Sequence, residues 1–248
     1  MTIEEQLMSQ VFISGATGAT GRLLVGQLLE AGYAVTAMVR SRARAHSILQ
    51  DHHNLSIVEG SVLDMPDQEL DDLIRSCSWV VSCLGHNATL KGIWGHPRKL
   101  VTQSVEKLCQ SIERIAASDT VRRKFILMGS NGVLNPVQSE KYSVADGVVV
   151  SAVRLAVPPH ADNEQAAWYL QNARAIEWVV VRPDALVDAP EVSAYKSFAT
   201  HQKGVIFNSG KTSRINVAGF MKELISQPEV WQQWTGKMPV LYNANSLT

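Results

Sequence analysis

Cysteine is scarce in this 248-residue chain, and its scarcity excludes two classes of stabilised small domain. The three cysteines, Cys77, Cys83 and Cys109, are odd in number and form no Cys-x-x-Cys pair. A disulfide framework or a zinc ribbon is therefore not expected. Because Cys83 lies in an apolar run, we expect it to be a buried structural thiol rather than a reactive one.

Long apolar runs are also missing. The longest, Val148 to Val157, is interrupted by Arg154 and is too short to span a bilayer. Residues Met1 to Gln10 are polar, carry two acidic side chains and lack the basic region of a secretory signal. From these absences we expect a cytoplasmic protein without a membrane partner.

An excess of charge of one sign is missing as well, because 23 Lys and Arg residues balance 23 Asp and Glu residues. A nucleic-acid partner usually requires a basic excess, so none is expected, and a small-molecule substrate is the partner that remains. The 46% hydrophobic content excludes intrinsic disorder. A chain of this length buries roughly 70–75% of its unfolded surface without disulfide or metal staples.

What the chain does contain is an alternation of strand-like and helix-like segments. Short runs of apolar, often β-branched residues predict strands at 11–14, 34–39, 55–59, 79–84, 124–128 and 178–182. Helical periodicity between them predicts helices at 23–29, 42–50, 67–75, 97–115 and 163–173. Asp162 is the expected N-cap of the last of these helices. Beyond residue 182 we expect extended pieces at 205–207 and 212–216, a helix at 217–226 and a strand at 239–242.

This alternation predicts the α/β class, with a single Rossmann-like doubly wound parallel sheet and helices on both faces over residues 1–248. A closed (β/α)₈ barrel needs eight comparable units, which the region after residue 182 does not supply. Substrate loops are expected at about residues 86–97, 129–163 and 184–212, at the sheet edge where open α/β folds bind ligands.

A glycine-rich turn follows the first strand directly, with the spacing Gly-x-x-Gly-x-x-Gly. Glycines let the backbone turn tightly and approach a pyrophosphate, and the next helix directs free N–H groups and a partial positive charge at the phosphates. A turn without a ligand is the alternative, but the strand before and the helix after both favour a dinucleotide. The predicted cofactor-binding residues of the turn are Gly15, Thr17, Gly18, Ala19, Thr20 and Gly21.

The end of the second strand predicts which dinucleotide is bound. NAD-binding proteins tend to place an acidic residue there for the ribose hydroxyls, whereas this chain has Val39-Arg40-Ser41-Arg42 followed by Arg44. A guanidinium is able to bind a 2′-phosphate in a bidentate way, and Arg22 lies close enough to join it. We therefore expect NADP(H) rather than NAD(H), with Arg22, Arg40 and Ser41 among the binding residues. The alternative is a solvated basic edge.

Several segments together resemble the atypical short-chain dehydrogenase/reductases, in the branch similar to flavin/biliverdin reductases and to nitrogen-regulator-type NAD(P)-binding proteins. The segments that carry the resemblance are the glycine turn, Val39-Arg40, Gly60 to Asp64, Val81 to Gly85, Val181 to Leu186 and Ser213 to Met221.

The resemblance implies a position for several further residues. Asp64 is expected near the adenine, with Leu84 and Gly85 lining the adenosine pocket. Pro183 and Leu186 are expected against the nicotinamide. Ser130, in Met128-Gly129-Ser130-Asn131-Gly132, matches the position of an active-site serine. Each of these residues also has a purely structural interpretation as a turn, strand-end or loop residue.

The larger family's Tyr-x-x-x-Lys pair, which handles the proton, is absent, since no tyrosine is followed four residues later by lysine. Proton transfer therefore needs another group or water. His160 is the leading candidate because imidazole titrates near neutral pH, with Asp162 close enough in sequence to orient it. Ser130 and Tyr142 complete the predicted catalytic set, and Asn163 lies near the position of an active-site histidine in the flavin-reductase branch. The alternative for His160 is a surface histidine before a helix.

These observations favour an NADP(H)-dependent oxidoreductase that transfers hydride to a small carbonyl, quinone or flavin-like acceptor. A non-catalytic NADP(H)-binding redox sensor is the alternative that the missing Tyr/Lys pair motivates, and an NAD(P)-dependent epimerase or isomerase is a further one. No metal is expected, because neither His52-His53 nor any other cluster has metal-ligand spacing. The expected assembly is a monomer or a homodimer.

Overall fold

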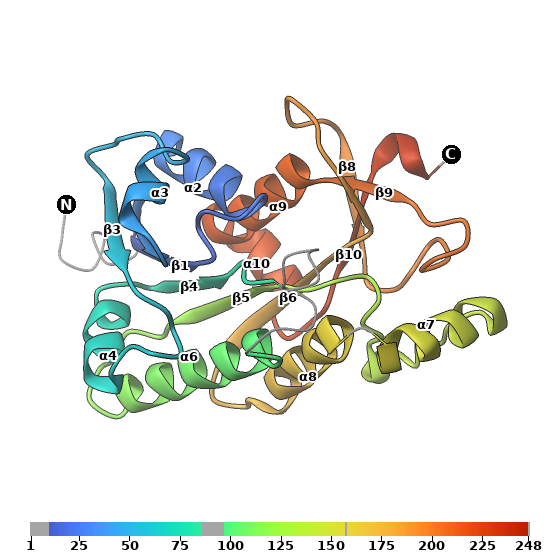
Figure 1. Ribbon diagram of the computed structural model, residues 1–248, viewed down its shortest axis with the longest axis horizontal. Coiled ribbons are helices and arrows are strands. Elements are labelled where there is room, and N and C mark those ends of the chain that lie inside the picture. The colour runs from blue at the N-terminus through green and yellow to red at the C-terminus, as the bar shows by residue number, and fades with distance from the viewer. Residues whose placement is uncertain (1–9, 86–96, 157, 248) are drawn as a thin grey trace.

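A computed structural model describes residues 10–85, 97–156 and 158–247, with the side chains of 151–159 left out. An eight-stranded sheet runs through the middle of the molecule with helices on both sides (Figure 1). Its strand order is β3-β2-β1-β4-β5-β6-β10-β8, and every pairing is parallel except that of β10 with β8. The predicted doubly wound, Rossmann-like α/β fold is confirmed.

The strands of the sheet are β1 (Gln10–Ser14), β2 (Ala34–Val39), β3 (Leu55–Glu59), β4 (Trp79–Ser82), β5 (Lys124–Met128), β6 (Glu177–Pro183), β8 (Tyr195–Phe198) and β10 (Val240–Asn243). A separate parallel pair consists of β7 (Ala185–Val187) and β9 (Lys211–Ser213). The helices are α2 (Gly21–Glu30), α3 (Arg42–His46), α4 (Asp67–Arg75), α6 (Leu100–Ala116), α7 (Val144–Ala156), α8 (Pro158–Asn172), α9 (Arg214–Ser226) and α10 (Pro228–Trp234), with 3₁₀ turns at Pro136–Gln138 and Ala244–Ser246.

Two hydrophobic cores form because successive residues of a strand point to opposite faces of the sheet. Val11 and Ile13 of β1 pack with α2, α9 and α10, whereas Phe12 between them packs with α4, α6 and α8. In Figure 1, α2 and α9 lie above the sheet and α4, α6 and α8 below it. Trp231 and Trp234 are both buried, and Trp231 meets Trp79 edge to face at 4.8 Å, so these tryptophans pack the core.

The strand order reverses between β1 and β4, which both lie at the centre of the sheet. Connections from neighbouring strands leave in opposite directions at this point, which opens a crevice at the carboxyl ends of the strands. The glycine turn follows β1 there. Within the described ranges, no helix combines the length and the apolar character needed to cross a membrane.

Parts of the predicted organisation are wrong. The expected loop at 129–163 contains α7 and the start of α8, and the loop at 184–212 contains β7 and β8. The loop at 86–97 lies outside the described residues apart from position 97. Residues 205–207 form no strand, because their backbone N–H groups donate to the Asp146 carboxylate at 3.2, 3.1 and 2.9 Å.

The start of α8 also differs from the prediction. Its first residues are Pro158 and Pro159, which a first helical turn tolerates, so Asp162 lies inside the helix and is not its N-cap. The Asp162 carboxylate instead accepts the backbone N–H groups of Val101 at 2.8 Å and Thr102 at 2.9 Å. Asp162 thus satisfies the N-terminus of the neighbouring helix α6.

Candidate active site

The glycine turn has a geometry that side chains would destroy. Gly15 has a φ of +78°, and a Cβ there would lie 2.6 Å from the backbone carbonyl of Cys83. A Cβ on Gly21 would lie 2.2 Å from the carbonyl oxygen of Gly15. These contacts press the turn against the end of β4 and against the first turn of α2, so glycine is needed at both positions.

The turn also leaves backbone donors for an anion. Thr20 occupies the N-cap position of α2, but its side chain forms no capping hydrogen bond. Gly18 and Ala19 are exposed, Thr17 is partly buried and Thr20 is buried. The N–H groups of Arg22 and Leu23 already donate to the carbonyls of Gly18 and Thr20, both at 3.0 Å. The N–H groups of residues 19–21, at the positive end of the α2 dipole, are therefore the ones that a phosphate is able to approach.

The basic residues at the start of α2 and after β2 do not all lie at the same site. Arg22 and Arg40 are exposed near the turn, whereas Arg42 lines a separate cleft with His46, His52 and His53. Ser41 is the N-cap of α3, and its hydroxyl accepts the backbone N–H of Arg44 at 3.3 Å.

The residues assigned to the adenosine lie on the neighbouring strand ends. Asp64 is exposed in the turn after β3, and its N–H donates to the Ser61 carbonyl at 3.2 Å. Leu84 is partly buried and Gly85 exposed just beyond β4. Burial raises the pKa of the Cys83 thiol to about 12, which agrees with the expected structural role.

A cleft of about 390 Å³ opens at the carboxyl ends of β5 and β6. It brings together the predicted residues Ser130, His160, Pro183 and Leu186, which are up to 56 positions apart in the sequence. Its complete lining is Gly129, Ser130, Asn131, Gly132, Val150, His160, Asn163, Pro183, Asp184, Ala185, Leu186, Val205 and Ile206. The apolar members favour a ligand with an extended apolar or aromatic surface.

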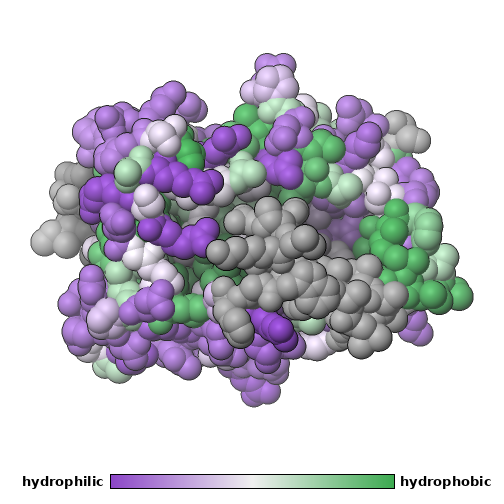
Figure 2. All heavy atoms as spheres, viewed as in Figure 1, coloured by the Kyte–Doolittle hydropathy of each residue, from purple (hydrophilic) through white to green (hydrophobic). Residues whose placement is uncertain are grey.

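The surface near this cleft differs from the rest. Val144, Val148 and Phe207 are 89%, 69% and 54% exposed, and Figure 2 shows apolar side chains gathered over α7. The opposite side, over α3 and α4, is mainly hydrophilic (Figure 2).

The side chains of Ser130 and His160 both lie close to Gly132. A Cβ on Gly132 would lie 3.2 Å from Cε1 of His160 and 3.6 Å from Oγ of Ser130. Ser130 Oγ accepts the N–H of Gly132 at 3.2 Å, which leaves its own proton available to the cleft. The roles of Ser130 and His160 stay predictions, but the two side chains lie on one wall of the cleft.

Two other predictions about proton transfer change. Tyr142 is not among the residues that line the cleft. Its hydroxyl donates to the backbone carbonyl of Gly132 at 2.5 Å and so stabilises the segment that carries the lining residue Gly132. That Asp162 orients His160 stays a prediction, and the helix geometry does not favour it, because residues two apart on a helix face different directions. The His160 imidazole lines the cleft, whereas the Asp162 carboxylate faces α6.

Asp184 is a cleft residue that sequence reasoning missed. It is 4% exposed, directly follows β6, and accepts the N–H groups of Ala185 at 2.7 Å and Gly210 at 2.9 Å. Burial is the largest effect on its carboxyl group and raises its pKa above the ordinary value for aspartate. Its place one residue after Pro183, at the end of a buried strand, was the available signal.

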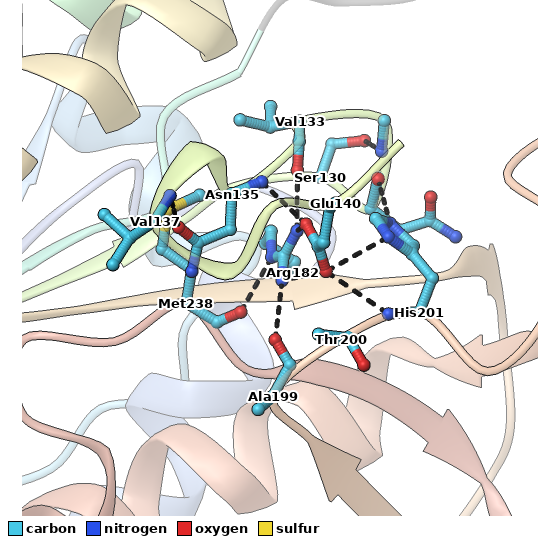
Figure 3. A network of polar contacts seen from close by, with 12 residues as sticks. Ser130, Val133, Asn135, Val137, Glu140, Arg182, Ala199, Thr200, His201 and Met238 are labelled. Atoms are coloured by element: carbon cyan, nitrogen blue, oxygen red, sulfur yellow. Dashed lines mark hydrogen bonds and ion pairs between the residues drawn. The ribbon is translucent and has the colours of Figure 1, made fainter. Parts of the chain in front are cut away.

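A buried ion pair beneath the cleft was also missed (Figure 3). Arg182 is fully buried in β6, and its guanidinium donates to both oxygens of Glu140, at 2.6 and 3.0 Å. His201 reaches the same carboxylate through Nδ1 at 3.2 Å and contacts the Asn131 carbonyl through Nε2 at 2.7 Å. A charged residue inside an apolar strand was the signal for this cluster.

This cluster joins four segments that are distant in sequence, because it also includes Met238 just before β10. Arg182 also donates to the carbonyls of Val133, Met238 and Ala199, so β6 is tied to the segments after β5 and β8. Bonds from His201 and Arg182 outweigh burial and lower the pKa of Glu140 to about 2. The segments that form the walls of the cleft are therefore held together by a buried ion pair that stays charged near neutral pH.

Comparison with known proteins agrees with this geometry. A family model described as NAD(P)H-binding matches residues 15–228. An uncharacterised chloroplastic protein of Arabidopsis thaliana is 42% identical over 74 residues, which are 30% of this chain and 26% of that relative. The match thus spans about a quarter of the relative's own length.

Solved structures show the same fold at low identity. A short-chain dehydrogenase/reductase of Veillonella parvula in complex with NADP has a TM-score of 0.71, 17% identity and 97% coverage of both chains. The oxidoreductase YlbE of Lactococcus lactis has a TM-score of 0.68 and 19% identity, covering 95% of this chain and 91% of its own. An anaerobillin reductase of Escherichia coli O157:H7 has a TM-score of 0.68 and 15% identity, with coverages of 95% and 98%.

The family model begins at Gly15, the first glycine of the turn, and continues through α9 to the start of α10. It therefore includes the turn, the strand ends around it and the cleft of β5 and β6. The chain belongs to the NAD(P)H-binding family.

Proposed function

We propose that the protein is an NADP(H)-dependent oxidoreductase that transfers hydride to a small carbonyl, quinone or flavin-like acceptor. One observation carries the proposal: the glycine turn and the 390 Å³ cleft open at the carboxyl ends of strands of the same parallel sheet. A dinucleotide held at the turn extends along this edge, so that its far end reaches the cleft. The fold neighbours include an oxidoreductase and an anaerobillin reductase, which supports a reductase of this type.

The residues present fit a dinucleotide. The positions at which a Cβ would collide, Gly15 and Gly21, form a cradle for the pyrophosphate, and the uncapped start of α2 supplies N–H donors. In this proposal, Asp64, Leu84 and Gly85 hold the adenosine, and their position at the ends of β3 and β4 supports it. When bound, the cofactor supplies the hydride.

The preference for NADP(H) rests on charge. Arg40 and Arg22 are exposed beside the turn, and no acidic residue occurs from 31 to 50 to accept the ribose hydroxyls of NAD. A guanidinium pairs with a 2′-phosphate through two parallel hydrogen bonds.

On the acceptor side, the chain's own residues position the substrate. Pro183 and Leu186 form the floor for the nicotinamide ring, and Val150, Val205 and Ile206 exclude water from the acceptor. Ser130 and His160 lie on the wall above Gly132, where they hydrogen-bond a polar atom of the acceptor.

The test is a binding titration followed by a turnover screen. NADPH should bind with a dissociation constant in the micromolar range, and the screen should show NADPH oxidation with at least one quinone, flavin or aldehyde above the rate without protein. A protein that does not bind NADPH would refute the proposal. Binding without any turnover would favour the redox-sensor alternative, whose support is the missing Tyr-x-x-x-Lys pair.

A further inference from the structure

Asp184 is a buried acid placed at the cleft without a positive partner. It connects β6 to β7 and lines the cleft beside Pro183, which is proposed to contact the nicotinamide. Among the residues with described positions, no Lys or Arg side chain forms an ion pair with it, in contrast to Glu140 one strand away. Buried carboxyl groups without a cation are uncommon in structural roles and frequent at sites of proton transfer.

Backbone N–H groups fix the position of the Asp184 carboxyl group, but not all of its hydrogen-bond acceptor positions are used. Oδ1 accepts one N–H, from Ala185, and Oδ2 accepts one N–H, from Gly210. The Asn131 side chain also donates to this carboxyl. Each carboxyl oxygen offers two acceptor positions, so these three donors leave one position on the group for a proton or a ligand. A Cβ on Gly210 would lie 2.5 Å from the Tyr242 ring and 3.2 Å from Oδ2 of Asp184, so the fit around this carboxyl leaves no spare room.

The titratable groups around Asp184 do not neutralise it. His201 and Tyr242 face it from the segments after β8 and from β10, and the Asn131 amide faces it from the segment after β5. The His201 ring already contacts Glu140 and the Asn131 carbonyl, and the Tyr242 hydroxyl accepts the N–H of Gln202 at 3.1 Å. His160 is the other titratable group of the cleft lining. Desolvation therefore prevails at Asp184 and raises its pKa.

We propose that Asp184 is the proton donor for acceptors whose oxygen must be protonated, which makes carbonyl and quinone compounds the preferred substrate class. The inference rests on the proposed function. In an aldehyde, the carbonyl carbon receives the hydride and the carbonyl oxygen takes the Asp184 proton. In a quinone, one oxygen receives the hydride and the other takes the proton. In both cases the reduced nicotinamide becomes oxidised. The O–H bond of the carboxyl breaks, an O–H bond forms on the acceptor, and water returns a proton to the carboxylate.

Flavin acceptors provide the internal control, because a reduced flavin is released as an anion near neutral pH and needs no proton in the hydride step. In Asp184→Asn, reduction of quinones and aldehydes should fall by about 10²–10⁴-fold, the usual contribution of an acid, while flavin reduction falls far less. NADPH affinity should stay within about threefold of wild type. An equal fall for all acceptors, or none, overturns the proposal.

A second measurement uses the cofactor-free wild-type protein and does not depend on how the variant folds. The ¹³C signal of the Asp184 side-chain carboxyl, assigned by its loss in Asp184→Asn, should titrate above the ordinary midpoint of about 3.9. A midpoint at or below that value overturns the role of Asp184, whatever the activity. A wild-type protein that binds NADPH but reduces no acceptor refutes the proposed function, and the role of Asp184 with it.

Discussion

The two halves of the sheet's carboxyl edge are built in opposite ways. Beside β1 and β4 lies the glycine turn, which is proposed to bind the nucleotide and is called the nucleotide half below. It consists of seven consecutive residues held by backbone contacts, such as that of Gly15 with Cys83. Beside β5 and β6 lies the cleft that is proposed to bind the acceptor, called the acceptor cleft or acceptor half below. Residues between 129 and 206 line it, and the buried side chains of Arg182, Glu140 and His201 hold these segments together. The first half is therefore sensitive to added atoms and the second to lost charge.

The largest effect on stability is expected when the negative charge of Glu140 is removed. Glu140→Gln leaves the buried Arg182 guanidinium without its anion, which should lower the free energy of unfolding by about 3–5 kcal/mol. Urea denaturation measures this loss. A change below about 1 kcal/mol would show that the acceptor half does not depend on the ion pair.

Acid should weaken the same support. Because the folded-state pKa of Glu140 is lowered from its ordinary value to about 2, its contribution is complete above the unfolded-state value near 4.5 and is lost as pH falls towards 2. The free energy of unfolding should therefore fall by roughly 3 kcal/mol over this window. Glu140→Gln should flatten the profile, and a variant that loses stability as steeply as wild type would exclude Glu140 as the cause.

The nucleotide half should fail when a single methyl group is added. Gly21→Ala places a Cβ 2.2 Å from the Gly15 carbonyl, and the displacement should cost about 1–3 kcal/mol and weaken NADPH binding about tenfold or more. Gly26→Ala, five residues later in α2, is the matched control, since its Cβ meets nothing within 4 Å. That control should bind NADPH normally and gain about 0.5–1 kcal/mol of stability. Equal binding by both variants would contradict the close approach.

The smallest effect concerns cofactor choice. Arg40→Asp should reduce the preference for NADPH over NADH by about tenfold or more, because a charge-assisted bond to the 2′-phosphate becomes a repulsion. Arg42→Asp makes the same charge change at a residue that lines the histidine cleft, and it should alter the preference little. Comparing the affinities of the two cofactors in both variants separates the role of Arg40 from a general effect of charge.

This contrast also explains what could be predicted from the sequence. The strands at 34–39, 55–59 and 124–128 were predicted with the observed bounds. The first and third are largely buried apolar runs, whereas 55–59 is a partly buried edge strand that its β-branched Ile57 and Val58 indicate. The glycine turn was recognisable since all its determinants are adjacent. Helix α7 was missed because Gly147 and the β-branched Val148, Val149 and Val150 are weak helix formers.

The support of the acceptor cleft was not predictable in the same way. Glu140 and Arg182 are 42 positions apart, and Glu140 and His201 are 61 apart, so no local spacing relates them. Asp184 accepts the N–H of Gly210, 26 positions further on. Only the packed fold brings these groups together, which is why the predicted catalytic set included Tyr142 and omitted Asp184.

In the proposed reaction, hydride passes from NADPH bound at the glycine turn to an acceptor bound in the cleft. The most direct test uses an aldehyde acceptor and NADPH carrying deuterium at C4 of the nicotinamide, followed by mass spectrometry of the alcohol product, because deuterium bound to carbon does not exchange with water. We expect one of the two C4-labelled forms of NADPH to transfer deuterium to the acceptor carbon. In a parallel reaction with unlabelled NADPH in deuterated water, no deuterium should enter that position. A reduced product without deuterium from either form would contradict it.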